Sequence, residues 1–302
     1  MKKVVVTGGA GFIGSNLVDA LIQKDVEVIV LDNLSTGKIN NIHKDATFLH
    51  IDLFSVSVNE LINIFFDVDI VFHLAALARV QPSIEDPIPY NNANVTATLN
   101  VLHAANKAKV KRVVYSASSS CYGNAIKVPQ KEDDSTNPLS PYGLQKFIGE
   151  QYCRMFSVVY GLDTVSLRYF NVYGERMNLE GAYCLVTGIF ARQMKDGKPL
   201  TITNDGNQKR DFTYVGDVVE ANILAATHVN DLCGEVLNIG NGKSISINQV
   251  ADMFGGKKVY GEKRLEPFET LADNQKAKNI LNWQPKGDLE KWIEIYKIQL
   301  GI

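Results

Sequence analysis

The chain has 302 residues, of which 45% are hydrophobic and 21% charged, and its formal net charge is -2. This length and composition predict a globular protein with a sizeable core in one large domain or two, and the charge gives no reason to expect nucleic acid or an anionic membrane as a partner. The four cysteines are far apart with no Cys-x-x-Cys, and no apolar stretch reaches about 18 residues, so we expect a cytoplasmic protein with reduced thiols and without a metal site, signal peptide or membrane span.

A strand, a glycine turn and a helix open the chain. Residues 3–7 read as a short buried strand, which runs into Gly8, Gly11 and Gly14 and then an amphipathic stretch ending near residue 24. Glycines at this spacing permit a tight turn, a close approach of the backbone to a pyrophosphate, and a phosphate facing a helix N-terminus. Residues 26–31 form a second strand ending in Asp32, whose carboxylate can bind an adenosine ribose and repels a 2′-phosphate. The segment therefore predicts NAD rather than NADP.

Further strands alternate with helical patterns. Residues 47–52 form a strand ending in Asp52, which is placed to hold the adenine amino group, and residues 69–76 form a strand whose Ala75 and Ala76 leave room for the cofactor. Strands are also expected over residues 110–116 and 162–169. This alternation predicts an α/β fold, a doubly wound parallel Rossmann sheet covered by helices on both faces. Ligands in such sheets lie at the carboxyl ends of the strands, where we find Gly8, Asp32, Ala75, Ser118 and Asn171.

The alternation breaks down from about residue 172 into glycine-punctuated segments. We expect an NAD-binding domain over residues 1–171 and a smaller, mainly substrate-binding α/β lobe over 172–302, with residues from about 210 to 230 interleaved with the sheet. Within that stretch, residues 210–215 resemble a strand, and Asp217 resembles a helix cap. Residues 288–300 predict a terminal helix with Trp292, Ile295 and Ile298 as its buried stripe.

A hydroxyl-rich run and a Tyr-x-x-x-Lys pair carry the predicted chemistry. Ser118 lies in the run at the end of a strand, and Tyr142 and Lys146 share one face of a helix. A free tyrosine has a pKa near about 10, but positive neighbours can lower this pKa and make the phenol a usable proton acceptor. With twelve tyrosines, roughly one such pair is expected by chance, so its weight comes from the glycine turn that precedes it. Together the two features indicate oxidation chemistry.

In this order, the motifs resemble the extended short-chain dehydrogenase/reductase family and, within it, the nucleotide-sugar 4-epimerases. The supporting segments are residues 73–76, 94–95, 140–143, 167–174, 210–212 and 272–277, and the resemblance covers nearly the whole chain. It implies tightly held NAD that is consumed and regenerated within one turnover, and inversion of C4 of a UDP-hexose through a 4-keto intermediate. It also implies a homodimer formed through the helices around residues 95–106 and 145–158.

The resemblance assigns roles to individual residues. Tyr142 would take and return the proton of the sugar 4-hydroxyl, Ser118 would hydrogen-bond the reacting oxygen, and Lys146 would hold the ribose and lower the pKa of Tyr142 together with the cationic nicotinamide. The implied cofactor-binding residues are Gly8, Gly11, Phe12, Ile13, Gly14, Asp32, Asn33, Asp52, Leu53, Leu74, Ala75, Ala76, Asn94, Ser116, Tyr142, Lys146 and Tyr169. The implied substrate-binding residues are Ser118, Asn171, Arg210, Arg264 and Thr270, with the two arginines on the diphosphate and Lys263 as the alternative to Arg264.

Three positions bear on the choice of reaction and substrate. The 4,6-dehydratases of this family carry an Asp-Glu pair, and its decarboxylases usually a glutamate, where this chain has Ser119 and Ser120, so simple C4 inversion is favoured. Thr270 stands where a bulky aromatic restricts some relatives to plain hexoses, which favours UDP-N-acetylglucosamine and UDP-N-acetylgalactosamine as well as UDP-glucose and UDP-galactose. The alternatives are a dehydratase or decarboxylase of the same family and a non-catalytic NAD-binding protein.

Overall fold

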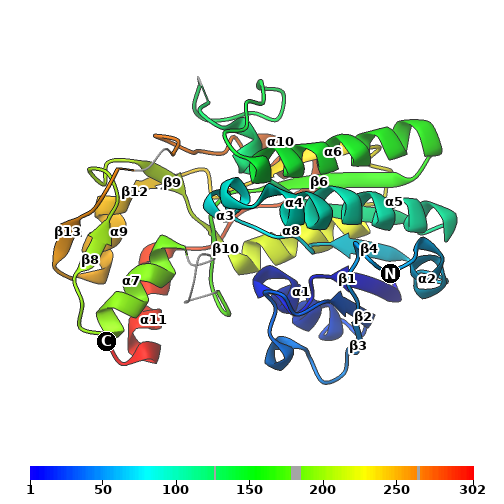
Figure 1. The fold of residues 1–302 in the computed structure, drawn as a ribbon, viewed down its shortest axis with the longest axis horizontal. Coiled ribbons are helices and arrows are strands. Elements are labelled where there is room, and N and C mark those ends of the chain that lie inside the picture. Colours follow the sequence, from blue (N-terminus) through cyan, green and yellow to red (C-terminus); the bar gives the residue numbers. More distant parts are fainter. Residues whose placement is uncertain (126, 178–184, 264–265) are drawn as a thin grey trace.

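Seven strands form a parallel sheet at the centre of the protein (Figure 1). The structure is a computed structural model, and it describes residues 1–125, 127–177, 185–263 and 266–302. The strands of the sheet are β1 Lys3–Thr7, β2 Glu27–Asp32, β3 Thr47–His50, β4 Ile70–His73, β5 Arg112–Ser118, β6 Asp163–Tyr169 and β11 Glu235–Ile239. Their order is β11-β6-β5-β4-β1-β2-β3, so β2 and β4 flank β1 on opposite sides. Such a reversal of strand order opens a crevice at the carboxyl ends of β1 and β4.

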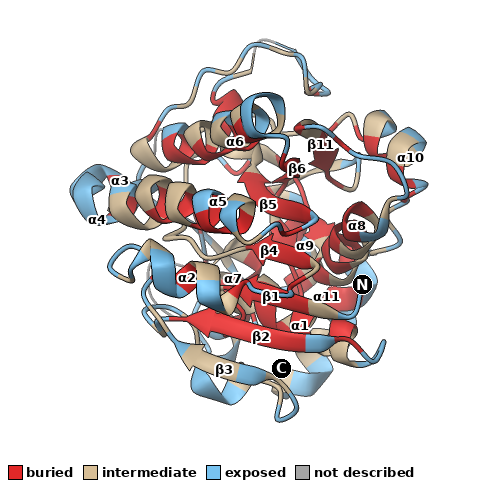
Figure 2. Ribbon diagram, turned by 90° about the vertical axis from the view of Figure 1, so that its right-hand side faces the viewer, coloured by how far each residue is buried: buried red, intermediate tan, exposed pale blue. Residues whose placement is uncertain are grey.

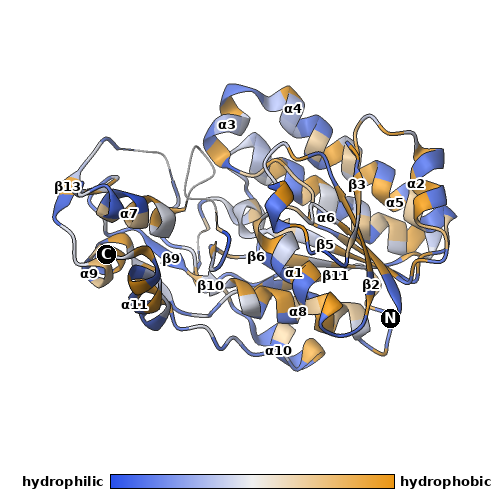
Figure 3. Ribbon diagram, turned by 90° about the horizontal axis from the view of Figure 1, so that it is seen from below, coloured by the Kyte–Doolittle hydropathy of each residue, from blue (hydrophilic) through white to orange (hydrophobic). Residues whose placement is uncertain are grey.

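Helices cover both faces of the sheet because the side chains of its strands alternate. Val4 and Val6 of β1 pack with α1 Phe12–Ile22, α8 Val215–Thr227 and α10 Gln275–Leu281, whereas Val5 packs with α2 Val58–Ile64, α5 Ala97–Lys107 and α6 Pro141–Tyr160. Figure 2 shows the buried strands between these two layers, and Figure 3 shows the apolar strands between α5 on one side and α8 and α10 on the other. The predicted α/β fold with a doubly wound parallel sheet is confirmed.

Short helical elements connect β4 to α5 and complete the rim of the sheet. They are α3 Val80–Glu85, α4 Pro87–Asn91 and a π-helical turn over Asn92–Thr96. Elsewhere, the 3₁₀ turn Ile39–Asn41 lies between β2 and β3, and the 3₁₀ turn Ser119–Tyr122 follows β5. Both α3 and α4 pack against α6. This contact sets the position of the segment after β4 relative to the start of α6, which matters for the site.

A second group of elements forms a smaller lobe beside the sheet (left in Figure 1). Its elements are α7 Val186–Lys195, α9 Ile247–Phe254, α11 Leu289–Leu300, β8 Leu200–Ile202, β9 Lys209–Asp211, β12 Ser244–Ser246 and β13 Lys258–Tyr260. Phe190, Phe254 and Trp292 are at the centre of its core. The strands β7 Val172–Tyr173 and β10 Thr213–Tyr214 pair in parallel where the chain passes between the lobe and the sheet.

Two sequence-based expectations in the second half of the chain were wrong. Asp217 does not cap α8, whose N-cap is Tyr214; its carboxylate instead accepts hydrogen bonds from the backbone N–H groups of Lys286 and Gly287. In α11, the predicted stripe is buried only at Trp292, since Ile295 is 57% exposed and Ile298 79% exposed. Residues three apart in an α-helix are rotated by about 60° relative to each other, so a stripe with this spacing turns away from the core. The buried residues of α11 are Leu289, Trp292 and Ile293.

The described residues contain no helix that is both long enough and apolar enough to cross a membrane.

Candidate functional site

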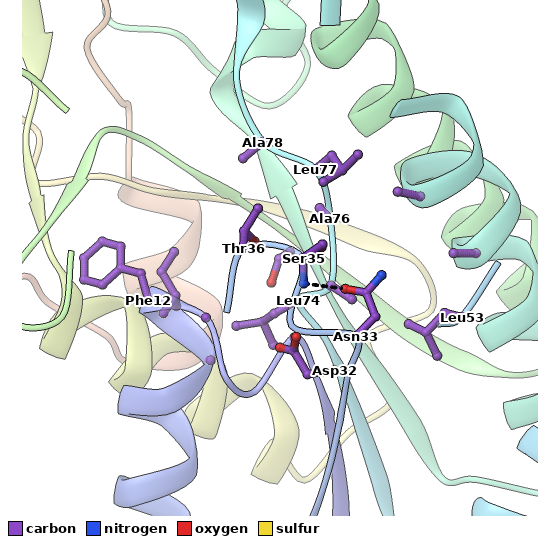
Figure 4. Close-up of a pocket in the computed structure, with 18 of the residues that line it drawn as sticks. Phe12, Asp32, Asn33, Ser35, Thr36, Leu53, Leu74, Ala76, Leu77 and Ala78 are labelled. Atoms are coloured by element: carbon purple, nitrogen blue, oxygen red, sulfur yellow. Dashed lines mark hydrogen bonds between the residues drawn. The ribbon is translucent and has the colours of Figure 1, made fainter. Parts of the chain in front are cut away.

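A cavity of about 470 Å³ lies at the carboxyl ends of the central strands (Figure 4). Of the cofactor-binding residues predicted from the sequence, Asn94 does not border this cavity. Those that do are Gly8, Gly11, Phe12, Ile13, Gly14, Asp32, Asn33, Asp52, Leu53, Leu74, Ala75, Ala76, Ser116, Tyr142, Lys146 and Tyr169. Other residues of its wall, among them Lys38, Asn41, Arg79 and Arg176, were missed by the sequence analysis.

The glycine turn has the dimensions of a phosphate cradle. Gly8 has a φ of 71°, and a Cβ on Gly8 would lie 2.7 Å from the backbone nitrogen of Ala75. A Cβ on Gly14 would lie 2.1 Å from the carbonyl oxygen of Gly8, so neither position has room for a side chain. The first turn of α1 has no side-chain cap, and its N-terminus borders the cavity. Backbone N–H groups and the helix dipole there suit a pyrophosphate, so the turn fits a dinucleotide.

The carboxylate of Asp32 is oriented by backbone hydrogen bonds and can still accept hydrogen bonds from a ligand. One carboxylate oxygen accepts a hydrogen bond from the backbone N–H of Ala10 at 3.0 Å and the other from that of Leu34 at 2.8 Å. A carboxylate has about four acceptor sites, so capacity remains for ribose hydroxyls. Next to it, the amide of Asn33 donates to Asp52 at 3.3 Å. The edge of the cavity near β2 and β3 therefore fits an adenosine.

Asn94 supports the cavity wall from behind. Its side chain is 1% exposed. Its oxygen accepts from the N–H of Leu77, and its nitrogen donates to the carbonyl of Leu77 and to the side chain of Gln145, all at 2.9–3.0 Å. The residue thus fixes the loop after β4, a role that the sequence did not reveal.

Tyr142 and Ser118 meet at the other end of the cavity. Ser140 caps α6, and the backbone N–H of Tyr142 donates to the Ser83 hydroxyl of α3 at 3.1 Å. The Ser118 hydroxyl hydrogen-bonds the Tyr142 phenol, and it also accepts from the Ser120 hydroxyl at 2.9 Å. The predicted pairing of the phenol with a serine at the end of β5 is present in the structure.

The pKa of Tyr142 differs from the sequence-based expectation. Desolvation raises this pKa above 10, while the Ser118 hydrogen bond and the positive charge of Arg79 oppose the rise. The ammonium of Lys146 lies 4.5 Å from the centre of the Tyr115 ring, and burial lowers its own pKa to about 7. Arg79 is thus the positive charge that opposes the rise of the Tyr142 pKa here, and the effect expected of Lys146 together with the nicotinamide stays a prediction.

Three of the residues predicted for the substrate, Asn171, Arg210 and Thr270, come together at the lobe. The Asn171 amide donates to the Thr270 hydroxyl at 3.3 Å, and the backbone N–H of Thr270 donates to the carbonyl of Lys209, next to Arg210. Arg210 donates to the carbonyls of Lys209 and Pro267 at 2.8 Å and pairs with the carboxylate of Glu266. Arg264 lies outside the described residues.

Glu266 is a neighbour of the predicted clamp that the sequence analysis missed. Besides Arg210, its carboxylate accepts hydrogen bonds from Thr203, Asn204 and Gln208. No local sequence pattern marks it, because Arg210 and Glu266 are 56 residues apart. A diphosphate on Arg210 must compete with this carboxylate for the guanidinium.

A cavity with a phosphate cradle at one end and a hydrogen-bonded phenol at the other defines a dinucleotide-binding protein equipped for redox chemistry. The chain belongs to the NAD dependent epimerase/dehydratase family, whose model matches residues 4–240. The resemblance drawn from the motifs is thereby confirmed, as is the predicted use of NAD.

Several relatives match over nearly the whole chain. A Methanocaldococcus jannaschii protein provisionally named UDP-glucose 4-epimerase is 40% identical, with 96% of each chain covered. The crystal structure of a UDP-glucose 4-epimerase from Thermotoga maritima with UDP-glucose superposes with a TM-score of 0.93 at 37% identity and 99% coverage of both chains. The UDP-N-acetylglucosamine 4-epimerase of Methanobrevibacter ruminantium M1, in complex with UDP-N-acetylmuramic acid, has a TM-score of 0.90 at 38% identity, again with 99% of both chains covered.

Proposed function

We propose that the protein is an NAD-dependent UDP-sugar 4-epimerase that inverts C4 of UDP-hexoses. The observation that carries this proposal is the Tyr142 phenol in the wall of the NAD cavity, which hydrogen-bonds Ser118. Ser118 is followed by Ser119 and Ser120, which carry no carboxylate. The relatives described above, which are named as 4-epimerases of UDP-sugars, support it.

In the proposed reaction, Tyr142 removes the proton of the sugar 4-hydroxyl and later returns it, while Ser118 donates a hydrogen bond to the reacting oxygen. The glycine turn and Asp32 would hold NAD, which would supply reversible hydride transfer at C4 and so allow inversion through a 4-keto sugar. Lys146 would hold the nicotinamide ribose. The chain itself contributes orientation, exclusion of water and a proton held at one phenol oxygen.

The enzyme must bind the nucleotide part of the substrate firmly and the sugar part loosely, because the keto sugar has to rotate within the pocket before hydride returns to its other face. We assign the grip to the smaller lobe, which comes mainly from residues 172–302, with Arg210 binding the diphosphate by charge-assisted hydrogen bonds and Asn171 beside it. Lys263 is exposed next to Arg210's partner segment and is a second candidate for the clamp. Binding would replace the Glu266 carboxylate on Arg210 with phosphate oxygens.

The rival reactions of the family need an acid and a base that this site lacks. Ser119 and Ser120 lie in the 3₁₀ turn after β5, and the Ser120 hydroxyl donates its hydrogen bond to Ser118. Serine hydroxyls do not transfer protons at neutral pH without an activating base. Elimination of water or loss of carbon dioxide is therefore disfavoured here.

We further propose that the protein accepts the N-acetylated pair as well as the plain hexoses, since Thr270 is small and touches Asn171. Purified protein incubated separately with UDP-glucose and with UDP-N-acetylglucosamine should form both C4 epimers, resolved chromatographically. Thr270→Tyr should lower turnover of the acetylated pair roughly tenfold or more relative to the hexose pair. Thr270→Ser is the matched control and should retain both. Absence of activity on the acetylated pair alone would reject the broader specificity, and absence on both would reject the epimerase assignment.

We also propose a homodimer that forms in the cytoplasm through α5 and α6. These helices pack side by side, and the end of α6 exposes Val158, Val159 and Tyr160 by 75%, 63% and 54%. A buried interface would remove these apolar groups from water. Three cysteines of the described residues, Cys121, Cys153 and Cys233, are free thiols, as in a reducing compartment.

A charged substitution at the end of α6 tests the proposed dimer interface. Light scattering should give about twice 33.4 kDa for the wild type, and Val158→Glu should weaken association by at least about tenfold, or about 1.4 kcal/mol. Val229→Glu is the control, because Val229 is 93% exposed on the connection after α8. If both variants keep the dimer mass, the interface lies elsewhere.

A further inference from the structure

Arg79 occupies an unusual place beside the phenol. It follows β4, forms the N-cap of α3 and borders the same cavity as Tyr142. Its backbone has φ 113° and ψ 140°, in the region that favours glycine. A conformation of this kind costs about 1–3 kcal/mol at a non-glycine residue and persists where the surroundings enforce it, often at functional sites.

The structure holds the Arg79 segment against the start of the helix that carries Tyr142. The Ser83 hydroxyl of α3 accepts the backbone N–H of Tyr142 at 3.1 Å, and Asn94 secures the preceding loop through both backbone groups of Leu77. The guanidinium Nε of Arg79 is buried. The position of this cation relative to the phenol is therefore set by the fold.

The titratable groups around the phenol differ in how their charge depends on pH. Lys146 of α6 and Tyr169 of β6 line the same cavity as Tyr142, and Tyr115 of β5 interacts with Tyr142 electrostatically. Burial raises the pKa of both tyrosines, so they stay neutral, and it lowers the pKa of Lys146 to about 7, so the charge of Lys146 declines near neutrality. An arginine keeps its charge throughout this range.

We propose that Arg79 is a positioning residue for proton transfer, whose permanent positive charge stabilises the Tyr142 phenolate from the wall of the cavity that both residues line. This inference rests on the proposed function, in which Tyr142 is the base, and adds a second cation to the pair implied by the Tyr-x-x-x-Lys motif. The attraction acts through the low-dielectric interior, where a charge–charge interaction is stronger than in water.

The test compares three substitutions of Arg79 in the NAD-loaded protein. Arg79→Gln should move the acidic limb of the pH profile of kcat/KM to higher pH by about one unit. At a pH below this limb, kcat/KM should therefore fall about tenfold, with little change in KM. Arg79→Lys should keep the wild-type limb because it keeps the charge. Arg79→Gly should show the same displacement as the glutamine variant, yet its thermal midpoint should be no lower than that of the wild type, since glycine relieves the backbone strain.

A second readout does not depend on epimerase turnover. The near-ultraviolet difference absorbance of tyrosinate, wild type minus Tyr142→Phe, reports the ionisation of this one phenol. Its midpoint should rise in the Arg79→Gln background and stay in place in the Arg79→Lys background. The proposal would be overturned if the pH profiles and the titrations of the wild type and Arg79→Gln were superimposable. It would also be overturned if Arg79→Gln only raised KM, because Arg79 would then be a substrate-binding residue. A titration shift in a protein inactive on every UDP-sugar would uphold the role of Arg79 and reject the proposed function.

Discussion

Replacement of Tyr142 with phenylalanine is expected to lower kcat by about 10²–10⁴-fold, the usual contribution of a general acid–base group, while the protein keeps its NAD. Phenylalanine retains the ring that borders the cavity and removes only the phenol oxygen, which the Ser118 hydroxyl contacts. The phosphate cradle at Gly8 and Gly14 and the carboxylate of Asp32 are at the other end of the cavity and are unchanged. Conversion of UDP-glucose and the NAD released on denaturation would be measured on the same samples.

Tyr152→Phe is the matched control, because Tyr152 lies on the same helix, ten residues from Tyr142, and packs against the core between α5 and α6. It should retain activity within about threefold, as expected for a substitution that removes no catalytic group. An active Tyr142→Phe protein would show that another group takes the proton. Loss of both activity and NAD would show that the phenol is needed for the cavity itself.

The strands, the glycine turn and the cofactor end of the site could be predicted because their signals are local. The apolar run of β1, the glycines after it and the carboxylate ending β2 follow one another within 32 residues, and each has one physical interpretation. Tyr142 and Lys146 could be placed on one helix face from their spacing alone. These elements needed no knowledge of distant contacts.

The remaining features depend on contacts that only the fold creates. The upward shift of the Tyr142 pKa follows from burial, and the charge that opposes it belongs to Arg79, which is 63 residues away in the chain. The Arg210–Glu266 pair and the Asp217 hydrogen bonds join segments 56 and about 70 residues apart. Asn94 was read as a cofactor ligand, whereas its amide is committed to Leu77 and Gln145. Burial and partner geometry at long range are not encoded in a local motif.

His73 shows how such a buried network links the cofactor site to stability. The imidazole is 1% exposed at the end of β4, and its nitrogens lie 2.8 Å from the Thr7 hydroxyl and 2.9 Å from the Thr98 hydroxyl. Thr98 donates its own hydrogen to the carbonyl of Asn94, so Nε2 of His73 must carry the proton and Nδ1 must accept from Thr7. Thr7 in turn accepts the backbone N–H of Ala75 in the cavity wall. The network therefore requires a neutral imidazole.

The expected result is a loss of stability in acid that His73→Gln largely removes. Burial, and the charge of Lys146, lower the pKa of His73 from 6.5 to about 3. Between these values the unfolded chain binds more protons than the folded one, so the free energy of unfolding decreases as the pH falls through this window. The slope approaches about 1.4 kcal/mol per pH unit, on the order of 5 kcal/mol across the whole window.

Thermal midpoints measured from pH 7 downward should fall steeply for the wild type, and bound NAD should be lost over the same range because the network holds Ala75. Glutamine can donate and accept but does not titrate, so His73→Gln should be less stable at pH 7, by about 1–3 kcal/mol, and lose less stability below pH 6. His43→Gln, a substitution of a half-buried histidine outside the network, should follow the wild type. Parallel curves for the wild type and His73→Gln would mean that carboxylates, and not this imidazole, set the acid limit.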